Sequence, residues 1–342
     1  MVHKNRIGNI FSLTSFGESH GPAVGGVIDG MPAGVPINLD DIQFFVNRRR
    51  PGQSSVTSAR AEADRVHVLS GVFEGVTLGT PIGFVVYNED QHSSDYDALK
   101  DCYRPSHADF TYEAKFGRRD HRGGGRASAR ETVSRVVAGA FAMQALNRMG
   151  ITIRSKVIEA AGLPEPSPWY MEELIETIED ARRKGDTIGG CIRCIVSGVP
   201  AGLGEPVFDK LSAQLAYAMM SIPAAKAFEM GIGRDFARKM GSQVIDQFAT
   251  ADDGSITTLT NHSAGIQGGI SNGQEICFDV TFKPVATLMR PLPTVDRQGN
   301  PVTLQPGGRH DVYVVPRALP IVEAMAAIVM LDNVLMNRAS QI

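Results

Sequence analysis

Hydrophobic and polar positions along the chain form two similar series, one in each half. The first reads VGGVIDGMPAGVPINLDDIQFFVNRR from residue 24, and the second reads IGGCIRCIVSGVPAGLGEPVFDKLSAQLAYAMM from residue 188. Each series predicts a glycine pair, an apolar strand, a G-x-P-A-G turn, a short polar link and an amphipathic helix. A chance likeness between Gly/Pro-rich turns is the alternative to an internal repeat.

The likeness continues further along each half. SGVFEGVTLGTPIGFVVYN from residue 70 and GGISNGQEICFDVTFKP from residue 268 each predict a glycine turn followed by a hydrophobic strand. Long apolar helices are expected over roughly 130–148 and 319–338. We therefore predict an α+β fold in a single large domain of two pseudo-equivalent halves, residues 1–150 and 151–342, each a sheet with helices packed on one face.

Composition excludes several classes of protein. The 342 residues include 34 Lys and Arg against 37 Asp and Glu, and the formal net charge of −3 argues against non-specific binding to nucleic acid. The N-terminal residues lack the long apolar stretch of a signal peptide, and charged and polar residues interrupt the apolar segment 319–336. We therefore expect a cytoplasmic protein whose apolar segment is a core helix rather than a membrane span.

The four cysteines suggest neither a disulfide framework nor a metal site. Cys191 and Cys194 form a C-x-x-C pair, but no second pair completes a zinc site. The pair also lies in an expected strand, where positions three apart face opposite ways. No bound metal is expected.

The most unusual stretch is YEAKFGRRDHRGGGRASARETVSR, residues 112–135, where six arginines surround three consecutive glycines. Ser128 and the glutamate three residues later have the spacing of a capping box, so the glycines should lead directly into a helix N-terminus. Free N–H groups there, with the guanidinium groups of Arg126 and Arg130, are suited to binding an anion. The alternative is that Ser128 only caps the helix and the arginines are solvated.

A second basic cluster, NRRRPGQSSVTSAR from residue 47, contains Arg49, Arg50 and Arg60. Few aromatic residues interleave with either cluster, which weakens an interpretation as a single-strand nucleic-acid surface and favours compact anions. Three histidines in turns near basic residues are candidate proton donors to a leaving anion, although each alone is more often structural: His20, His107 and His310. His67, in an alternating strand, is expected to be structural.

Four long motifs resemble, in order, those of the chorismate synthase family: GESHGPAVGGVIDGMPAG, RPSHADFTYEAKFGRRDHRGGGRASARET, NHSAGIQGGISNG and GRHDVYVVPRALPIVEAM. The resemblance runs from about residue 7 to residue 338. It implies a β-α-β sandwich, usually assembled as a homotetramer, of the bacterial type. The implied reaction is the anti-1,4-elimination of phosphate from 5-enolpyruvylshikimate 3-phosphate to give chorismate, the last common step of the shikimate pathway to aromatic amino acids.

The resemblance also implies a requirement for reduced FMN, although the reaction has no net redox change. NADPH would be an indirect source of electrons. We expect an external flavin reductase, because 342 residues leave little room for a reductase domain. The substrate bears a phosphate and two carboxylates, which would explain why the chain needs its arginine clusters.

Carried over by motif, the resemblance assigns phosphate protonation to His20, control of flavin protonation to His107, and assistance to the flavin N5 to Asp311. Ser19 and Ser128 match serines near these histidines. Flavin contacts are expected at Arg126, Ala127, Ser128, Pro223, Ala224, Gly268, Lys283, Pro284, Val285, Ala286, Thr287 and Arg309. Contacts with substrate or NADP are expected at Arg49, Arg50, Arg60 and Arg130.

The chain departs from the family pattern at three places. Ser55 stands where arginine is common, Val312 replaces a proline after the key aspartate, and NHSAG at 261–265 replaces NHxGG. Two other functions stay open: a nucleic-acid-binding module that uses the same arginines, and a catalytically inactive relative that only holds FMN. Intact His20 and His107 count against the inactive relative.

Overall fold

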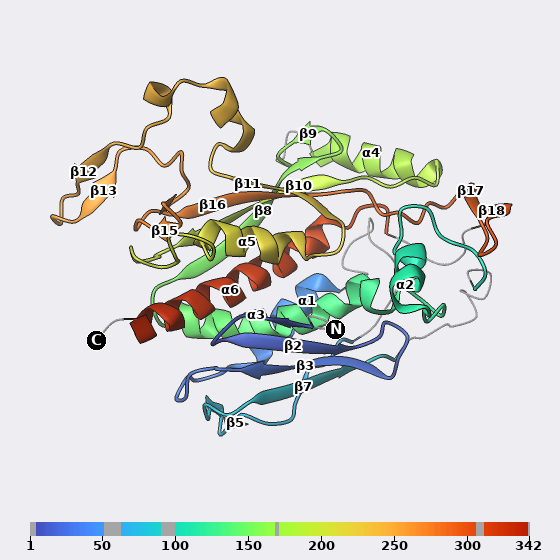
Figure 1. The fold of residues 1–342 in the computed structure, drawn as a ribbon, viewed down its shortest axis with the longest axis horizontal. Helices are drawn as coiled ribbons and strands as arrows, with labels where there is room; N and C mark the ends of the chain where they lie inside the picture. The colour runs from blue at the N-terminus through green and yellow to red at the C-terminus, as the bar shows by residue number, and fades with distance from the viewer. Residues whose placement is uncertain (1–4, 51–62, 90–99, 168–170, 306–310, 341–342) are drawn as a thin grey trace.

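The fold has three layers, with helices between two antiparallel sheets (Figure 1). The structure is a computed structural model that describes residues 5–50, 63–89, 100–167, 171–305 and 311–340. The middle layer contains α1 (Leu39–Arg49), α3 (Thr132–Asn147), α5 (Leu211–Met220) and α6 (Val315–Ser340). The predicted α+β class and the implied β-α-β sandwich are therefore confirmed.

The first sheet has the strand order β1-β2-β3-β7-β4 and comes entirely from the first half of the chain. Its strands are β1 (Arg6–Ile7), β2 (Ser12–Gly17), β3 (Ala23–Asp29), β4 (His67–Val68) and β7 (Ile82–Tyr87). The short hairpin of β5 (Val72–Phe73) and β6 (Val76–Thr77) precedes β7. Buried Val24 and Ile28 on β3 belong to the same core as the apolar side chains of α3.

The second sheet has the order β11-β16-β10-β8-β9 and comes from the second half. Its strands are β8 (Thr152–Ala160), β9 (Leu163–Pro164), β10 (Gly190–Ser197), β11 (Ala225–Met230) and β16 (Ile276–Phe282). Alternate residues of β10 are buried, so Cys194 is fully buried while Cys191 is partly exposed. This alternation confirms that the two cysteines face opposite ways.

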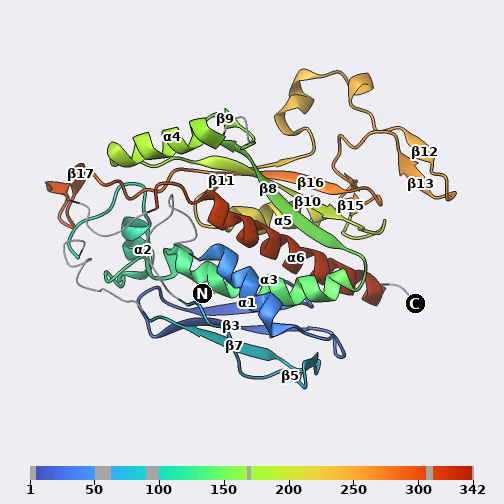
Figure 2. The ribbon, with the colours of Figure 1, turned by 180° about the vertical axis from the view of Figure 1, so that it is seen from behind.

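Helix α4 (Met171–Arg183) lies on the other side of the second sheet from the helix layer, as both views show (Figures 1 and 2). Its buried residues, Leu174, Ile178 and Ala181, recur at helical spacing. The expectation of helices on one face only was therefore wrong for this sheet. Each half supplies one sheet, while an origin of the halves by duplication stays a prediction.

Short elements complete the described chain. They are α2 (Asp109–Phe116), β12 (Phe248–Thr250), β13 (Ile256–Thr258), β14 (Ile266–Gln267), β15 (Ile270–Ser271), β17 (Leu292–Val295) and β18 (Pro301–Leu304). The segment 233–262, which contains β12 and β13, forms an arm that extends away from the layers (Figure 1). Helix α2 lies at the opposite end of the molecule, beside the basic loop that precedes α3.

Helices α3 and α6 pack closely in the middle layer. A Cβ on Gly139 would overlap the Cα and Cβ of Ala324. Within the described chain, α6 alone is long and apolar enough to cross a membrane, but 83% of its apolar window is buried in the protein. The polar residues that interrupt α6 have partners: Glu323 binds Arg48, and Asp332 accepts hydrogen bonds from three consecutive backbone N–H groups, at residues 9–11. The expected core helix is confirmed.

Candidate active site

The basic glycine loop folds against the turn that carries His20. This turn joins β2 to β3, and His20 is 8% exposed with its Nδ1 atom 3.1 Å from Ser19 Oγ. Gly123 is buried against the same turn, where an added Cβ would overlap His20 Nδ1 and lie 2.9 Å from Ser19 Oγ. The structure thus brings Ser19 and His20 together with the basic loop, and only glycine fits at the point of contact.

The path from the glycines into α3 differs from the prediction. Two short 3₁₀ turns, Gly125–Ala127 and Ala129–Glu131, intervene before Thr132. Ser128 Oγ accepts a hydrogen bond of 3.3 Å from the Arg130 N–H, but Glu131 pairs with Arg135 on the next turn. The first residues of α3 are fully buried. The prediction that the glycines lead directly into the helix was therefore wrong, because the loop first forms these two turns and α3 starts inside the core. Anion binding by the loop stays a prediction.

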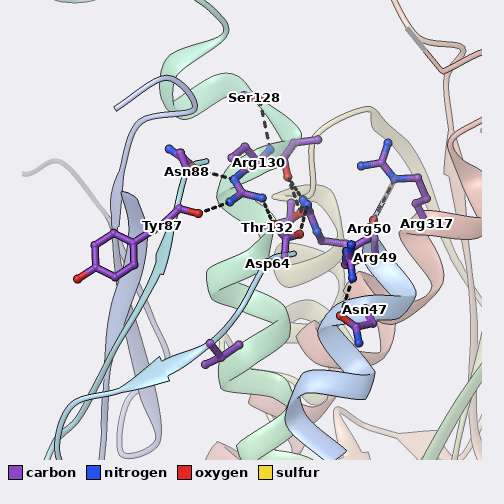
Figure 3. Close-up of polar contacts among 12 residues, drawn as sticks. Asn47, Arg49, Arg50, Asp64, Tyr87, Asn88, Ser128, Arg130, Thr132 and Arg317 are labelled. Carbon is purple, nitrogen blue, oxygen red and sulfur yellow. Dashed lines mark hydrogen bonds and ion pairs between the residues drawn. The ribbon is translucent and has the colours of Figure 1, made fainter. Parts of the chain in front are cut away.

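A buried carboxylate joins the two arginine clusters (Figure 3). Asp64 has a fully buried side chain that binds Arg49 Nη2 through Oδ2, at 3.1 Å, and Arg130 Nη1 through Oδ1. Burial would raise the pKa of Asp64, but the adjacent Arg49 and Arg130 outweigh it and lower the pKa. Burial also lowers the pKa of Arg49 to about 10. Two of the four arginines expected to contact substrate or NADP, Arg49 and Arg130, therefore have an internal partner.

Arg130 also connects this cluster to the His20 turn. Its Nε donates to Asn88 Oδ1 at 2.8 Å, and its Nη2 donates to the Tyr87 carbonyl at 3.3 Å. The Asn88 amide in turn donates to the carbonyls of Gly21, at 2.7 Å, and Glu18, at 3.2 Å. Asn88 therefore holds both ends of the turn that carries His20 and ties it to Arg130, the contact that Figure 3 shows.

The first turn of α6 and the residues just before it reach the same cluster. Arg317 Nε donates to the Arg49 carbonyl at 2.9 Å, and its Nη1 pairs with Asp311. Arg50 Nη1 donates to Asn47 Oδ1 at 3.4 Å (Figure 3). Asp311 thus lies beside the arginines, while its expected role at the flavin N5 stays a prediction. The predictions for Arg60, Arg309 and His310, and the departure at Ser55, fall outside the described residues.

His107 precedes α2 and has its own carboxylate. Its Nδ1 lies 3.1 Å from Asp109 Oδ1, and Asp109 also accepts two hydrogen bonds from the Arg104 guanidinium, at 2.8 and 2.7 Å. Burial opposes ionisation of Asp109, but the bonds from Arg104 and His107 outweigh it and hold the pKa of Asp109 far below its usual range. Asp109 is therefore ionised at neutral pH and orients the His107 ring.

A cavity of about 500 Å³ separates the His107 segment from the glycine loop. The aromatic rings of Tyr112 and Phe116 line it, with centroids 5.4 Å apart, together with Glu18 and the backbone of the glycine loop. Burial raises the pKa of Glu18, although the charge of Arg126 opposes this. Ala127 and Arg126 also line the cavity. The site therefore offers flat apolar surfaces beside histidine and guanidinium groups.

Residues of the second half reach the His107 segment. Lys283 Nζ donates to the Ser106 carbonyl at 2.9 Å, and the Lys283 N–H donates to the Ala224 carbonyl at 3.0 Å. Pro223 precedes Ala224, and the remaining predicted residues follow Lys283 directly: Pro284, Val285, Ala286 and Thr287. The structure thus brings these two segments to the site.

Gly268 is not brought to this site within one chain. It lies in the turn between β14 and β15, next to Gly269, whose carbonyl accepts from the N–H of Leu211 at the start of α5. Ala224 follows the other end of α5. The ten-residue helix therefore separates Gly268 from Ala224 by about 15 Å.

Four residues that hold the site were missed in the sequence. Asp109 had a signal, because it stands two residues after His107 in SHAD. Asp64 is an acid that follows an arginine-rich run, which is a weak signal. Nothing in the sequence distinguished Asn88 or Arg317, because the contacts that join them to the arginine clusters, with Arg130 and with the Arg49 carbonyl, span 42 and 268 residues of the chain.

Fold and site together define an α+β enzyme for a small anionic compound, with two oriented histidines beside a basic loop. The chorismate synthase family model matches residues 11–335. A chorismate synthase of Bacteroides thetaiotaomicron is 53% identical over 99% of both chains, and one of Chloroflexus aurantiacus is 49% identical over 99% of this chain and 97% of the relative. A crystal structure of a chorismate synthase superposes with a TM-score of 0.76 at 28% identity, covering 96% of this chain and 93% of that one. The chain belongs to the chorismate synthase family.

Proposed function

We propose that this chain catalyses the anti-1,4-elimination of phosphate from 5-enolpyruvylshikimate 3-phosphate to give chorismate. It then acts as a carbon–oxygen lyase on a small molecule, in the last common step of the shikimate pathway. Membership of the family supports the reaction. The structural observation that carries the proposal is the contact of the basic glycine loop with Ser19 and His20.

The elimination breaks the carbon–oxygen bond to phosphate and one C–H bond, and forms a new carbon–carbon double bond. His20 Nδ1 faces Ser19 Oγ, so its Nε2 is the atom that would give a proton to the departing phosphate oxygen. A proton supplied there lowers the charge on the leaving group. The turn held by Asn88 keeps the ring in place for this transfer.

We further propose reduced FMN as the cofactor. The residues of the 500 Å³ cavity fit such a group, because Tyr112 and Phe116 offer flat aromatic faces and the glycine loop offers unobstructed backbone. When bound, a reduced flavin supplies the transient electron donation that helps an elimination in which the C–H proton is not acidic. His107, oriented by Asp109, would hold a proton beside it, and Lys283 and Ala224 would complete the binding surface.

Three finer proposals rest on the family resemblance. An external reductase that uses NADPH would supply reduced flavin. The working form would be a homotetramer in the cytoplasm. The charge distribution supports a small substrate over a nucleic acid, because Arg49, Arg104 and Arg130 pair with buried carboxylates rather than forming an exposed basic surface.

Anaerobic turnover tests the proposed function. Protein is mixed with 5-enolpyruvylshikimate 3-phosphate and chemically reduced FMN, and chorismate absorbance and phosphate release are followed together. We expect equal rates of both products, and neither product with oxidised FMN. Folded protein that binds FMN without turnover would instead support the inactive relative.

Two variants test the assigned histidines. We expect His20→Ala and His107→Ala each to lower kcat by about 10²- to 10⁴-fold, the usual contribution of a general acid or base, with FMN binding retained. His67→Gln, in β4 outside the site, is the matched control and should keep full turnover. Normal turnover by both site variants would overturn the assignment.

A further inference from the structure

The basic glycine loop makes a second contact, at the end that lies before the three glycines. Arg119 contacts both α2 and the segment that precedes His107, and only 6% of its side chain is exposed. Its Nη2 donates to the carbonyls of Lys100, at 3.2 Å, and Cys102, at 3.0 Å. Its Nε donates to Glu113 Oε2 on α2 at 3.4 Å. The guanidinium group therefore joins the loop to two other stretches of the chain.

Arg119 also reaches the carboxylate that orients His107. Its Nη1 lies 3.7 Å from Asp109 Oδ1, the same oxygen that lies 3.1 Å from His107 Nδ1. At this distance the contact is an ion pair without a hydrogen bond, so Arg119 acts on Asp109 by charge and packing. The direct bonds to Asp109 come from Arg104, and the two carbonyls that Arg119 binds lie four and two residues before Arg104. Removal of Arg119 would therefore loosen the backbone from which the His107 ring is held.

The two ends of the loop thus contact two different histidine segments. Arg119 holds the segment before α2, and Gly123 packs on the His20 ring. Four residues of chain span at most about 13 Å. Between these ends, the Asp120 carboxylate accepts hydrogen bonds from the Arg122 N–H at 3.1 Å and from its guanidinium at 2.9 and 2.7 Å. The loop therefore limits how far the two histidine segments can separate.

We propose that Arg119 is a positioning residue for His107, so that the glycine loop sets both histidines relative to each other. The alternative is that Arg119, which also lines the 500 Å³ cavity, binds a ligand directly. Its donors argue against this, because Nε and Nη2 bind protein oxygens and Nη1 faces Asp109. A guanidinium group used in this way has few donors left for a ligand. The inference rests on the role proposed above for His107.

A double-mutant cycle tests this role in the anaerobic turnover assay. We expect Arg119→Met to lower kcat about 10- to 100-fold with an unchanged KM for 5-enolpyruvylshikimate 3-phosphate, because a misplaced group slows the reaction without weakening substrate binding. In a His107→Ala background the same substitution should change kcat less than about twofold, since no ring is left to position. Loss of the same factor in both backgrounds would overturn the proposal, because it would show an independent structural or ligand-binding role.

The His107 ring also gives a readout that needs no turnover. The ionised Asp109 can only accept, so His107 Nδ1 carries a proton, and NMR of ¹⁵N-labelled histidine should show a hydrogen-bonded ring N–H that disappears in His107→Ala. We expect Arg119→Met to shift or broaden this signal, and an unchanged signal would overturn the proposal. Arg118→Met, at an exposed neighbour that also lines the cavity, is the matched control. It should leave the signal unchanged and alter kcat by the same factor with and without His107.

Arg119→Lys decides the matter if a thermal melt shows that the methionine variant does not fold. Lysine keeps the positive charge but lacks the planar fork that spans two carbonyls and Glu113, so the His107 signal should still shift and kcat should still fall. Wild-type signal and rate in this variant would overturn the proposal. If the wild type shows the His107 signal without turnover, the proposed function fails, while the signal still tests the contact of Arg119.

Discussion

At position 123, even a methyl group would collide with the imidazole of His20. The ring is buried in a turn that Asn88 holds at both ends, so it has little room to move aside. The glycine loop can therefore reach the His20 turn only while residue 123 has no side chain. The requirement is one of close approach, since no left-handed φ is needed there.

Gly123→Ala should separate the loop from the His20 turn. We expect a loss of about 10²-fold or more in kcat, because a misplacement of about 1 Å has that effect on a positioned group. The free energy of unfolding should fall by about 1–3 kcal/mol, as for other overpacked sites. Turnover and urea unfolding measure the two effects. Gly241→Ala, where an added Cβ meets nothing within 4 Å, is the control. Unchanged turnover in Gly123→Ala would show that the contact is dispensable.

Among single residues, some of the candidate site could be predicted from the sequence and some could not. His20, His107 and the glycine loop could be predicted as candidates because turn residues and basic residues stand beside them in the sequence. Asp64 could not, because its two partners lie 15 and 66 residues away and its backbone adopts a φ of +46°, unusual for a non-glycine residue. The sequence shows the arginines as two basic clusters, but their pairing with Asp64 depends on the tertiary fold.

At the scale of elements, the predicted strands and helices were largely correct, and their ends were less so. Periodicity indicated α3 and α6, but α3 starts two residues later than expected because the 3₁₀ turn Ala129–Glu131 stands before it. The layer order came from the family resemblance, since hydrophobic patterns do not say which sheet faces which helix. The departure NHSAG places Ala264, fully buried, at a φ of +55°, a conformation that favours the glycine of its relatives.

The arm at 233–262 is closed at its base by one carboxylate. Asp246 accepts hydrogen bonds from Thr260 Oγ1 at 2.6 Å and from the N–H groups of His262 and Ser263 at 2.8 and 2.9 Å. Burial opposes its ionisation, but these hydrogen bonds outweigh it and lower the pKa of Asp246 from 3.8 to about 2. The ionised carboxylate therefore stabilises the base of the arm.

Lowering the pH should remove the stabilisation that the ionised Asp246 carboxylate provides. Because the pKa is lower in the folded state, the stabilisation is complete above about pH 4 and disappears as the pH falls through 2. The unfolding free energy of the wild type should exceed that of Asp246→Asn near neutral pH, and the difference should shrink between pH 4 and pH 2. Denaturant unfolding across this range measures it. Asp252→Asn, on the same arm, should show no such convergence, and a constant gap for Asp246→Asn would contradict the assignment.

At the scale of the whole molecule, two sheets that do not pair with each other in the described chain are joined through the helix layer. Helix α6 contacts α1, α3 and α5 as well as strands β8 and β10 of the second sheet. It packs tightly against α3 at Gly139, where an added Cβ would overlap the Cα and Cβ of Ala324 and lie 2.8 Å from its carbonyl oxygen. The stability of both halves therefore depends on one helix crossing.

Gly139→Ala should force this crossing apart. We expect the unfolding free energy to fall by about 1–3 kcal/mol, the usual cost of an extra methylene in a packed core. Intrinsic helix propensity alone would favour alanine by about 1 kcal/mol, so the sign of the change decides between packing and propensity. Urea unfolding followed by far-UV and near-UV circular dichroism measures it, with Gly241→Ala as the control. A more stable variant would show that the helices separate without cost.

The same crossing determines when the protein can fold during synthesis. Helix α3 ends at residue 147, but α6 begins at residue 315, after every strand of the second sheet has been made. At about 5–20 residues per second, the ribosome needs roughly 10 to 30 s to cover that interval. During this time the first sheet can form and cover one side of α3, while the apolar side that awaits α6 stays open to water. A nascent chain of this protein therefore presents a hydrophobic helix face that chaperones can bind until its last helix emerges.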